Sequence, residues 1–256
     1  CLTPDGQMCA DIFVYDRQTG TTAQITGGFH HVPANGFSIA PTISADGRWV
    51  AFWSSANNLM ADDDGQCETA EGLTIYCLDV YLYDRQEKNL VRVPVGVPPA
   101  DGLISSFSRL GLSADGQWLA FAVPGESRLG AALGIGSGTM QVVVFDRLAG
   151  SYEIGSQTAE GEPGNGWAFS PDLSSDGRYL AFASSSSNLV PGDANNYSDV
   201  FVRDRQTGEI EMISRAVGGG LADYASGSSN PFYGLRISAD GRYVLFLSSA
   251  DNLTAE

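Results

Sequence analysis

A ten-residue stretch that occurs four times constrains the fold of this chain more than any other feature of its sequence. The first copy, residues 43–52, joins an apolar residue, a serine, a small residue and Asp-Gly to an apolar run that ends in Phe. The other copies are residues 112–121, 173–182 and 237–246. Such recurrence is the signature of a repeat architecture, so the fold must be interpreted as a repeat before any residue is assigned to a site.

Each copy predicts a β-hairpin. Asp-Gly between two apolar runs is a strong signal for a two-residue turn, in which both residues adopt positive φ. In the first copy, one strand therefore ends near Ser44 and the next begins near Arg48. The second strand is apolar on both faces, which indicates a sheet that is covered on both sides.

A third and a fourth strand complete the repeated unit. The third strand is expected at residues 11–17, 79–85, 141–147 and 199–205. The fourth is expected at residues 22–26, 90–95, 152–155 and 209–214. One such sheet cannot bury two apolar faces alone, whereas sheets stacked face to face around an axis bury them all. The sequence therefore predicts an all-β fold, a four-bladed β-propeller of four-stranded antiparallel blades.

The two ends of the chain are expected to share one blade. Asp240 of the last ten-residue copy has no Asp-Arg strand after it, and Asp16 of the first Asp-Arg strand has no ten-residue copy before it. We therefore expect one domain, residues 1–256, closed by a blade of residues 228–256 plus 1–27. The other blades are expected at residues 37–96, 103–156 and 166–216. Two alternatives stay open: the chain is part of a larger propeller, or a neighbouring chain completes the half-blade by strand exchange.

Four motifs carry a family resemblance. They are Ser-Ala-Asp-Gly-Arg at 44–48, Ala-Phe at 51–52, Asp-Val-Phe-Val-Arg-Asp at 199–204 and Gln-Thr-Gly at 206–208. With them the units resemble the TolB-type, WD-like β-propeller repeat of bacterial secreted and periplasmic proteins. The resemblance implies a propeller that serves as a docking platform, as a structural domain beside an enzyme or, occasionally, as an enzyme. The units here are longer than the usual repeat of that family, and a count of four is unusual for it.

The acidic composition excludes one class of partner. The formal net charge is −16 at pH 7, so the phosphates of a nucleic acid would be repelled. A surface of this sign favours cations or basic partners. The sequence contains no apolar run of about 20 residues, so we expect no transmembrane segment.

The four cysteines predict two disulfides and an oxidising compartment. Cys9 and Cys77 each lie two residues before the Asp that opens a third strand, and Cys1 and Cys67 each lie a short loop upstream. The repeat alignment therefore selects the pairs Cys1–Cys9 and Cys67–Cys77. Disulfides persist in an extracellular, cell-surface or periplasmic location. Free thiols are the alternative, and Cys1 as a lipidated first residue is another.

Two sets of oxygen-bearing side chains are candidates for binding Ca²⁺. The sets are Asp193, Asn195 and Asp199, and Asp62, Asp64 and Asp79. Oxygen ligands at alternating positions suit Ca²⁺, which takes six to eight of them. The alternative is that these side chains accept hydrogen bonds from loop amides and fix the turns.

The sequence favours a binding role over catalysis. It has neither a Ser/His/Asp triad signature nor a zinc motif, and its acidic pairs recur at the positions that define the repeat. We therefore predict a non-enzymatic extracellular or periplasmic propeller that acts by contact with other proteins or by self-assembly. The alternative is a carbohydrate-binding or carbohydrate-active propeller, a lectin or a lyase, with a glycan as its ligand.

Overall fold

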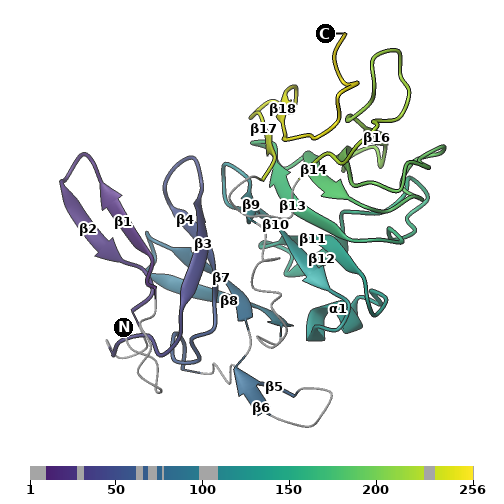
Figure 1. Ribbon diagram of the computed structural model, residues 1–256. Coiled ribbons are helices and arrows are strands. Elements are labelled where there is room, and N and C mark those ends of the chain that lie inside the picture. Colours follow the sequence, from purple (N-terminus) through teal and green to yellow (C-terminus); the bar gives the residue numbers. More distant parts are fainter. Residues whose placement is uncertain are drawn as a thin grey trace.

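Antiparallel β-sheet makes up nearly all of the regular structure. The computed structural model describes residues 10–27, 32–61, 66–68, 74–76, 78–97, 109–227 and 234–255, with the backbone alone for 66–68, 74–76 and 94–97. Three four-stranded sheets follow one another along the chain, and a two-stranded sheet lies at each end of the series (Figure 1). The all-β prediction and the prediction of four-stranded antiparallel sheets are confirmed.

The three complete sheets share one topology, in which each strand pairs with the next one of the repeat. The first sheet consists of β3 (Ser38–Ile43), β4 (Trp49–Ser54), β7 (Leu78–Asp84) and β8 (Asn89–Val97). The second consists of β9 (Gly111–Leu112), β10 (Trp118–Pro124), β11 (Met140–Asp146) and β12 (Ser151–Ile154). The third consists of β13 (Ala168–Leu173), β14 (Tyr179–Ser184), β15 (Asp199–Asp204) and β16 (Ile210–Met212).

Two small elements lie between the second and third strands of a sheet. The hairpin of β5 (Gln66–Glu68) and β6 (Thr74–Tyr76) separates β4 from β7. The helix α1 (Arg128–Ala132) separates β10 from β11, and Ser127 caps it by accepting a hydrogen bond from the Gly130 amide. No helix in the described part of the chain has the length and hydropathy needed to span a bilayer.

The repeat fixes the register of each sheet. The aromatic residue after Asp-Gly-Arg or Asp-Gly-Gln pairs with the Asp that ends the third strand. These pairs are Trp49 with Asp84, Trp118 with Asp146 and Tyr179 with Asp204. Because side chains alternate between the two faces of a strand, this shared register presents equivalent side chains to the neighbouring sheet in all three units.

The core consists of apolar layers between successive sheets. All six residues of β4 are buried, as expected for a sheet covered on both faces. Between the first and second sheets, the Trp53 and Phe121 rings meet edge to face with centroids 6.1 Å apart. Between the second and third sheets, Phe182 lies in the cluster that includes Val144, and it stacks on Phe201 at 5.7 Å.

The two ends of the chain form separate two-stranded sheets. β1 (Phe13–Asp16) pairs with β2 (Thr21–Gln24), and β17 (Arg236–Ile237) pairs with β18 (Val244–Leu245). These sheets lie at opposite ends of the series in Figure 1. The closure of the ring by its own two ends, which the sequence predicts, is therefore not seen.

Each half-sheet packs on the complete sheet that lies next to it in the series. Ile12 and Ile25, which flank β1 and β2, lie in one apolar cluster with Phe52 of the first sheet. Ile237 and Val244 lie in another with residues of the third sheet. The blade count of four stays a prediction.

Candidate functional site

The Asp-Gly turn is larger than the sequence predicts. Gly47 has φ +71°, but Asp46 is not among the residues with positive φ, so the prediction of two positive φ values is wrong. The Gly47 amide donates to Ser44 O at 2.9 Å, and the Ser44 amide donates to Trp49 O at 2.9 Å. The loop is thus a turn followed by a left-handed glycine, a position that costs glycine little.

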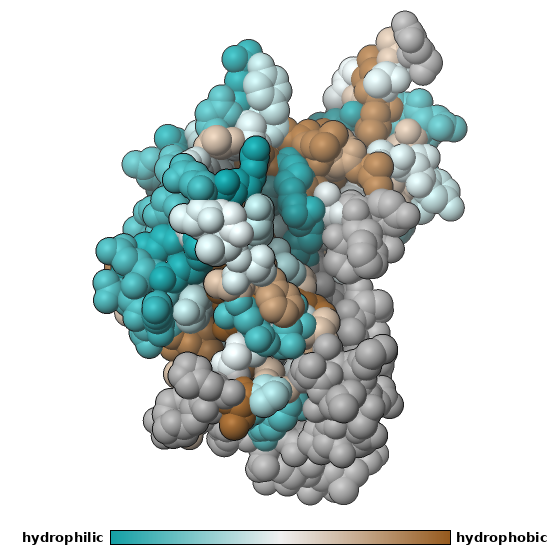
Figure 2. Space-filling model, turned by 90° about the vertical axis from the view of Figure 1, so that its left-hand side faces the viewer, coloured by the Kyte–Doolittle hydropathy of each residue, from teal (hydrophilic) through white to brown (hydrophobic). Residues whose placement is uncertain are grey.

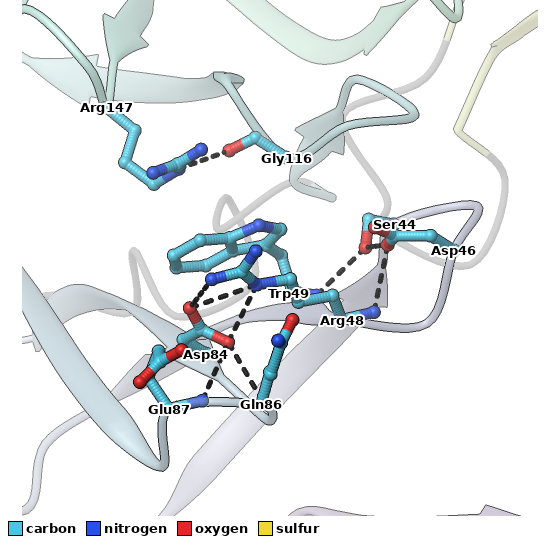
Figure 3. A network of polar contacts seen from close by, with 9 residues as sticks. All are labelled: Ser44, Asp46, Arg48, Trp49, Asp84, Gln86, Glu87, Gly116 and Arg147. Atoms are coloured by element: carbon cyan, nitrogen blue, oxygen red, sulfur yellow. Dashed lines mark hydrogen bonds and ion pairs between the residues drawn. The ribbon is translucent and has the colours of Figure 1, made fainter.

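The side chains of Ser44 and Asp46 form hydrogen bonds with each other and with backbone amides of the turn (Figure 3). Ser44 Oγ donates to Asp46 Oδ1 at 2.5 Å and accepts from the Trp49 amide at 2.9 Å. Asp46 Oδ1 also accepts from the Arg48 amide at 2.9 Å. These hydrogen bonds to the carboxylate lower the pKa of Asp46.

The same network occurs in the other three turns. The serine donates to the aspartate at 2.7 Å in Ser113–Asp115, 2.6 Å in Ser174–Asp176 and 2.5 Å in Ser238–Asp240. The repeated aspartates of Asp-Gly therefore have a structural role, because their acceptor atoms are used within the turn.

A second repeated carboxylate joins this turn to the third strand. Arg48 Nη2 lies 2.6 Å from Asp84 Oδ2, and Arg48 Nε donates to Oδ1 at 3.0 Å. This fork-like contact, with the Gln86 and Glu87 amides, lowers the pKa of Asp84 to about 2. Arg178 and Asp204 repeat the contact in the third sheet.

We expect these two carboxylates to set the acid limit of folding. The pKa of Asp84 and the pKa of Asp204 are each about 2, below the ordinary 3.8, so the folded state binds protons less readily than the unfolded chain. Their contribution to the free energy of unfolding is present above about pH 4 and is lost as the pH falls toward 2. Asp84→Asn combined with Asp204→Asn should flatten the decline measured by urea unfolding between pH 5 and pH 2.

Asp146→Asn is the matched control. Asp146 occupies the same position in the second sheet, but its partner is the neutral Gln117, whose Nε2 lies 3.4 Å away. This variant should retain the acid dependence of the original chain. Equal flattening in both variants would contradict the role assigned to the arginine pairs.

A glycine and an arginine of one sheet enclose an aromatic ring of the preceding sheet. We call this arrangement a turn socket, formed by the Gly of Asp-Gly and the Arg of Asp-Arg. The Trp49 ring lies so close to Gly116 that a Cβ there would overlap it, and Arg147 Cζ is 3.9 Å from the ring centroid (Figure 3). Arg147 Nε also donates to Gly116 O at 2.9 Å.

The socket is repeated at the next junction. The Trp118 ring meets Gly177, and Arg205 Cζ lies 4.0 Å from the ring centroid. Tyr179 meets Gly241 of the C-terminal half-sheet in the same way. A guanidinium over an aromatic face gains a cation–π contact, so the sockets stabilise the junctions between sheets.

A line of backbone hydrogen bonds runs beside the sockets. The Ala45 amide donates to Ala114 O at 3.1 Å, the Ala114 amide to Ser175 O at 2.8 Å, and the Ser175 amide to Ala239 O at 2.9 Å. This ladder starts in the first sheet and ends in the C-terminal half-sheet, and it links equivalent residues of four turns.

The series of sockets is incomplete at its two ends. The first socket consists of Gly47 and Arg85, whose Nη1 donates to Gly47 O at 2.6 Å. Among the described residues, only Arg85 comes near a Cβ built at Gly47. At the other end, Tyr243 stands where Trp49 and Trp118 stand in their sheets, but 62% of it is exposed. Within the described part of the chain, one socket therefore lacks a ring, and one ring lacks a socket.

The first predicted calcium set is only partly brought together. Asp199 is fully buried, and its two carboxylate oxygens accept from Ser214 Oγ at 2.6 Å and from Asn195 Nδ2 at 2.9 Å. Burial, and then the charge of Asp199, raises the pKa of Asp193 to about 6. In the part of the chain that the structure describes, no three His, Cys, Asp or Glu side chains gather in a way that could hold a metal ion.

Related hydrogen bonds occur at the start of other third strands. Asp11 accepts from Thr26 Oγ1 at 2.8 Å, and Gln141 accepts from Ser156 Oγ at 2.6 Å. This recurrence fits the alternative in which Asp199 fixes the loop.

Asp79 of the second predicted set is paired with a cation of the protein itself. Its Oδ2 lies 2.6 Å from Arg92 Nη2, and the carboxylate is buried. Asp62 and Asp64 lie outside the described residues. A Ca²⁺ ion at this position would therefore compete with a guanidinium that already neutralises Asp79.

Calorimetry tests the calcium prediction. If Asp193, Asn195 and Asp199 bind the ion, the melting temperature should be higher in Ca²⁺ than in EDTA, because a ligand of the folded state stabilises it. Asp193→Asn should remove that difference, whereas Asp223→Asn in the next loop should preserve it. The same melting temperature in Ca²⁺ and in EDTA would contradict calcium binding.

The predicted disulfides lie outside the described side chains. Cys1, Cys9 and Cys77 are not among the described residues, and Cys67 is described only through its backbone in β5, opposite Ile75. Both disulfides stay predictions.

The sequence did not predict one half-buried carboxylate. Asp172 on β13 accepts from the Ile237 amide at 3.0 Å, and burial raises its pKa to about 6. The charge of Arg109 acts in the opposite direction. Aligning the copies could have identified it, because Thr42, Gly111 and Arg236 occupy the equivalent positions. A carboxylate with a raised pKa is a candidate for a functional site, and here it also joins the third sheet to β17.

Exposed aromatic side chains gather at the other end of the third sheet. Tyr197 and Tyr224 stack with centroids 5.0 Å apart and are 37% and 54% exposed. Trp167, 42% exposed, donates from Nε1 to Gly138 O at 2.8 Å. All three lie in loops at the end where β14 stops and β15 starts. We call Trp167, Tyr197 and Tyr224 the aromatic loop end.

Comparisons with known proteins place the chain beside solved propeller structures. TolB from Acinetobacter baumannii is 17% identical, with a TM-score of 0.45, over 95% of this chain and 46% of that one. The β-propeller domain of the Trilobed protease from Pyrococcus furiosus is 13% identical, with a TM-score of 0.43, over 69% and 43%. The chain spans about half the length of these structures.

An acylaminoacyl peptidase from Pyrococcus horikoshii is also similar, at 12% identity and a TM-score of 0.39, over 70% of this chain and 24% of that one. No protein-family model matches the sequence, and no curated protein matches it either.

Proposed function

We propose that this chain is a non-catalytic extracellular or periplasmic propeller protein that acts through protein–protein contact, as a scaffold or as an assembly subunit. Each chain contributes four blade equivalents, namely three complete sheets and two half-sheets. The aromatic loop end is the observation that carries the proposal. Tyr and Trp are enriched where proteins meet, because a large apolar body and a polar tip both find partners there.

The repeated acidic groups support a binding role. Asp46 and its equivalents are used in turn networks, and Asp84 and Asp204 are used in arginine pairs. A group that is fixed by structural contacts in every repeat is not available as a general acid or base. The aromatic loop end, by contrast, lies in loops that connect the strands, and specificity resides in such loops.

Photo-crosslinking tests this proposal. Benzoylphenylalanine in place of Tyr224 should give a discrete protein adduct in the producing cells. The same label in place of Leu148, which is 68% exposed in the β11–β12 turn, is the control and should not. No adduct from Tyr224, or equal adducts from both positions, would contradict a protein-binding role for the aromatic loop end.

A glycan-binding function is the second candidate, because the exposed Tyr197–Tyr224 stack also suits the apolar face of a sugar ring. Glycan-array binding that Trp167→Ala or Tyr224→Ala abolishes, in the absence of a protein adduct, would favour it over the scaffold. Turnover of the bound glycan would further identify a lyase.

A further inference from the structure

The two half-sheets are complementary parts of one repeated unit. β18 corresponds to the second strand of a complete sheet and β1 corresponds to the third. In the complete sheets these strands always pair, as β14 does with β15. Among the described residues, β18 pairs with β17 and β1 pairs with β2, so each presents one unpaired edge. An unpaired edge of this kind is a template for another strand.

The side chains on these edges are exposed where their equivalents are buried. Phe13 on β1 is 58% exposed, whereas Phe201 at the same position of the third sheet is fully buried. Leu245 on β18 is 72% exposed, whereas the equivalent Ala181 is fully buried. Figure 2 shows hydrophobic surface in the upper part of the face it views, at the height of β17 and β18 in Figure 1.

The first and third complete sheets each have, on their outer side, a neighbouring sheet of only two strands. Ile43 of the first sheet is 49% exposed, whereas the equivalent Leu173, which faces the preceding sheet, is 6% exposed. The third sheet has a hollow of about 660 Å³ lined by residues that include Tyr179, Val202 and Glu211. Leu82 of the first sheet occupies the position that Val202 occupies in the third. In the first sheet, residues of β11 and β12 from the next sheet cover Leu82.

We propose that a second copy of this chain completes both ends, so that β18 of each copy pairs antiparallel with β1 of the other. The inference rests on the proposed function, because it names the partner of an assembly subunit. The register of the complete sheets places Tyr243 opposite Asp16 and Phe246 opposite Phe13 of the other copy. The half-sheets β17–β18 and β1–β2 then form one four-stranded sheet.

The same arrangement fills the unfilled socket. Tyr243 of one copy enters the socket of Gly47 and Arg85 in the other, as Trp49 enters the socket of Gly116 and Arg147. Arg242 reaches Asp16 of the other copy, as Arg48 reaches Asp84. The β17–β18 half-sheet covers Ile43, and β1–β2 covers the hollow on the third sheet.

A second copy fits better than the chain's own opposite end. Three complete sheets separate β1–β2 from β17–β18, and each half-sheet is held by an apolar cluster on its own neighbour. Two copies related by a two-fold axis form two identical junctions, and each junction pairs β18 of one copy with β1 of the other. The product is a closed ring of six complete sheets and two shared ones.

Size-exclusion chromatography with light scattering measures the mass of the assembly in solution. The chain should elute at twice the mass of one copy. Leu245→Asp and Phe13→Asp should each weaken association by about 100-fold, because either buries a carboxylate in an apolar junction. Both residues are exposed in a single copy, so circular dichroism should show the folded chain. Leu148→Asp, at an exposed leucine outside the edges, should remain a dimer.

A charge exchange gives a positive test of the register. Asp16→Arg alone and Arg242→Asp alone should each weaken the dimer by about 10-fold, whereas the two changes in one chain should restore it. A monomeric original chain, a larger assembly, a dimer that survives Leu245→Asp and Phe13→Asp, or a failure of the double exchange to restore association would overturn the inference. The adduct from Tyr224 is independent of these outcomes, so a foreign partner can be found even if the dimer is not.

Discussion

Replacing Phe182 by alanine should lower the free energy of unfolding by about 3–5 kcal/mol, the largest loss that we expect from a single change in this chain. Phe182 is fully buried between the second and third sheets, and its ring stacks on Phe201 at 5.7 Å. The deletion removes the ring from the apolar layer and leaves a cavity that two rigid sheets cannot close. Urea unfolding followed by fluorescence measures the loss.

Two variants separate this cavity effect from a general effect of truncation. Phe182→Leu keeps most of the volume and should cost less than about 1.5 kcal/mol. Leu148→Ala removes a side chain that is already 68% exposed and should change stability by less than about 0.5 kcal/mol. A loss of less than about 1 kcal/mol in Phe182→Ala would show that this layer does not hold the two sheets together.

Gly177→Ala should cost about 2–5 kcal/mol, because alanine meets two obstacles at this position. The residue has φ +71°, a left-handed conformation that costs alanine about 1–2 kcal/mol. Its Cβ would also overlap the Trp118 ring of the preceding sheet, which must then move away from Arg205. Overpacking of this kind adds about 1–3 kcal/mol.

Gly150→Ala is the matched control for the backbone term. Gly150 has φ +65°, but a Cβ there would meet nothing within 4 Å. The control should therefore cost about 1–2 kcal/mol, and the difference between the two variants measures the contact between sheets. Equal losses in thermal unfolding would mean that the turn socket contributes nothing to the junction.

The local structure could be predicted because each repeat contains its own short-range signals. The strands at 79–85 and 199–205 were expected as recurring segments of the repeat, and they lie at Leu78–Asp84 and Asp199–Asp204. The type of the Asp-Gly turn could not be predicted from the dipeptide. Ser44, two residues before Asp46, supplies hydrogen bonds that favour a longer loop with a single left-handed residue.

The candidate site was predicted less well, because it depends on contacts between repeats. Nothing near Trp49 in the sequence indicates that Gly116 and Arg147 will enclose its ring. Asp172 likewise accepts a hydrogen bond from Ile237 of β17, which lies 65 residues further along the chain. Such contacts depend on how successive sheets stack, and a local pattern does not contain that information.

The sequence by itself determined the unit: four antiparallel strands, their register and the faces that must be covered. These properties follow from side-chain period and turn chemistry, which act over a few residues. Only the tertiary structure decided what happens at the ends. In the described structure β1 and β18 of one chain do not pair, because three complete sheets lie between the two half-sheets.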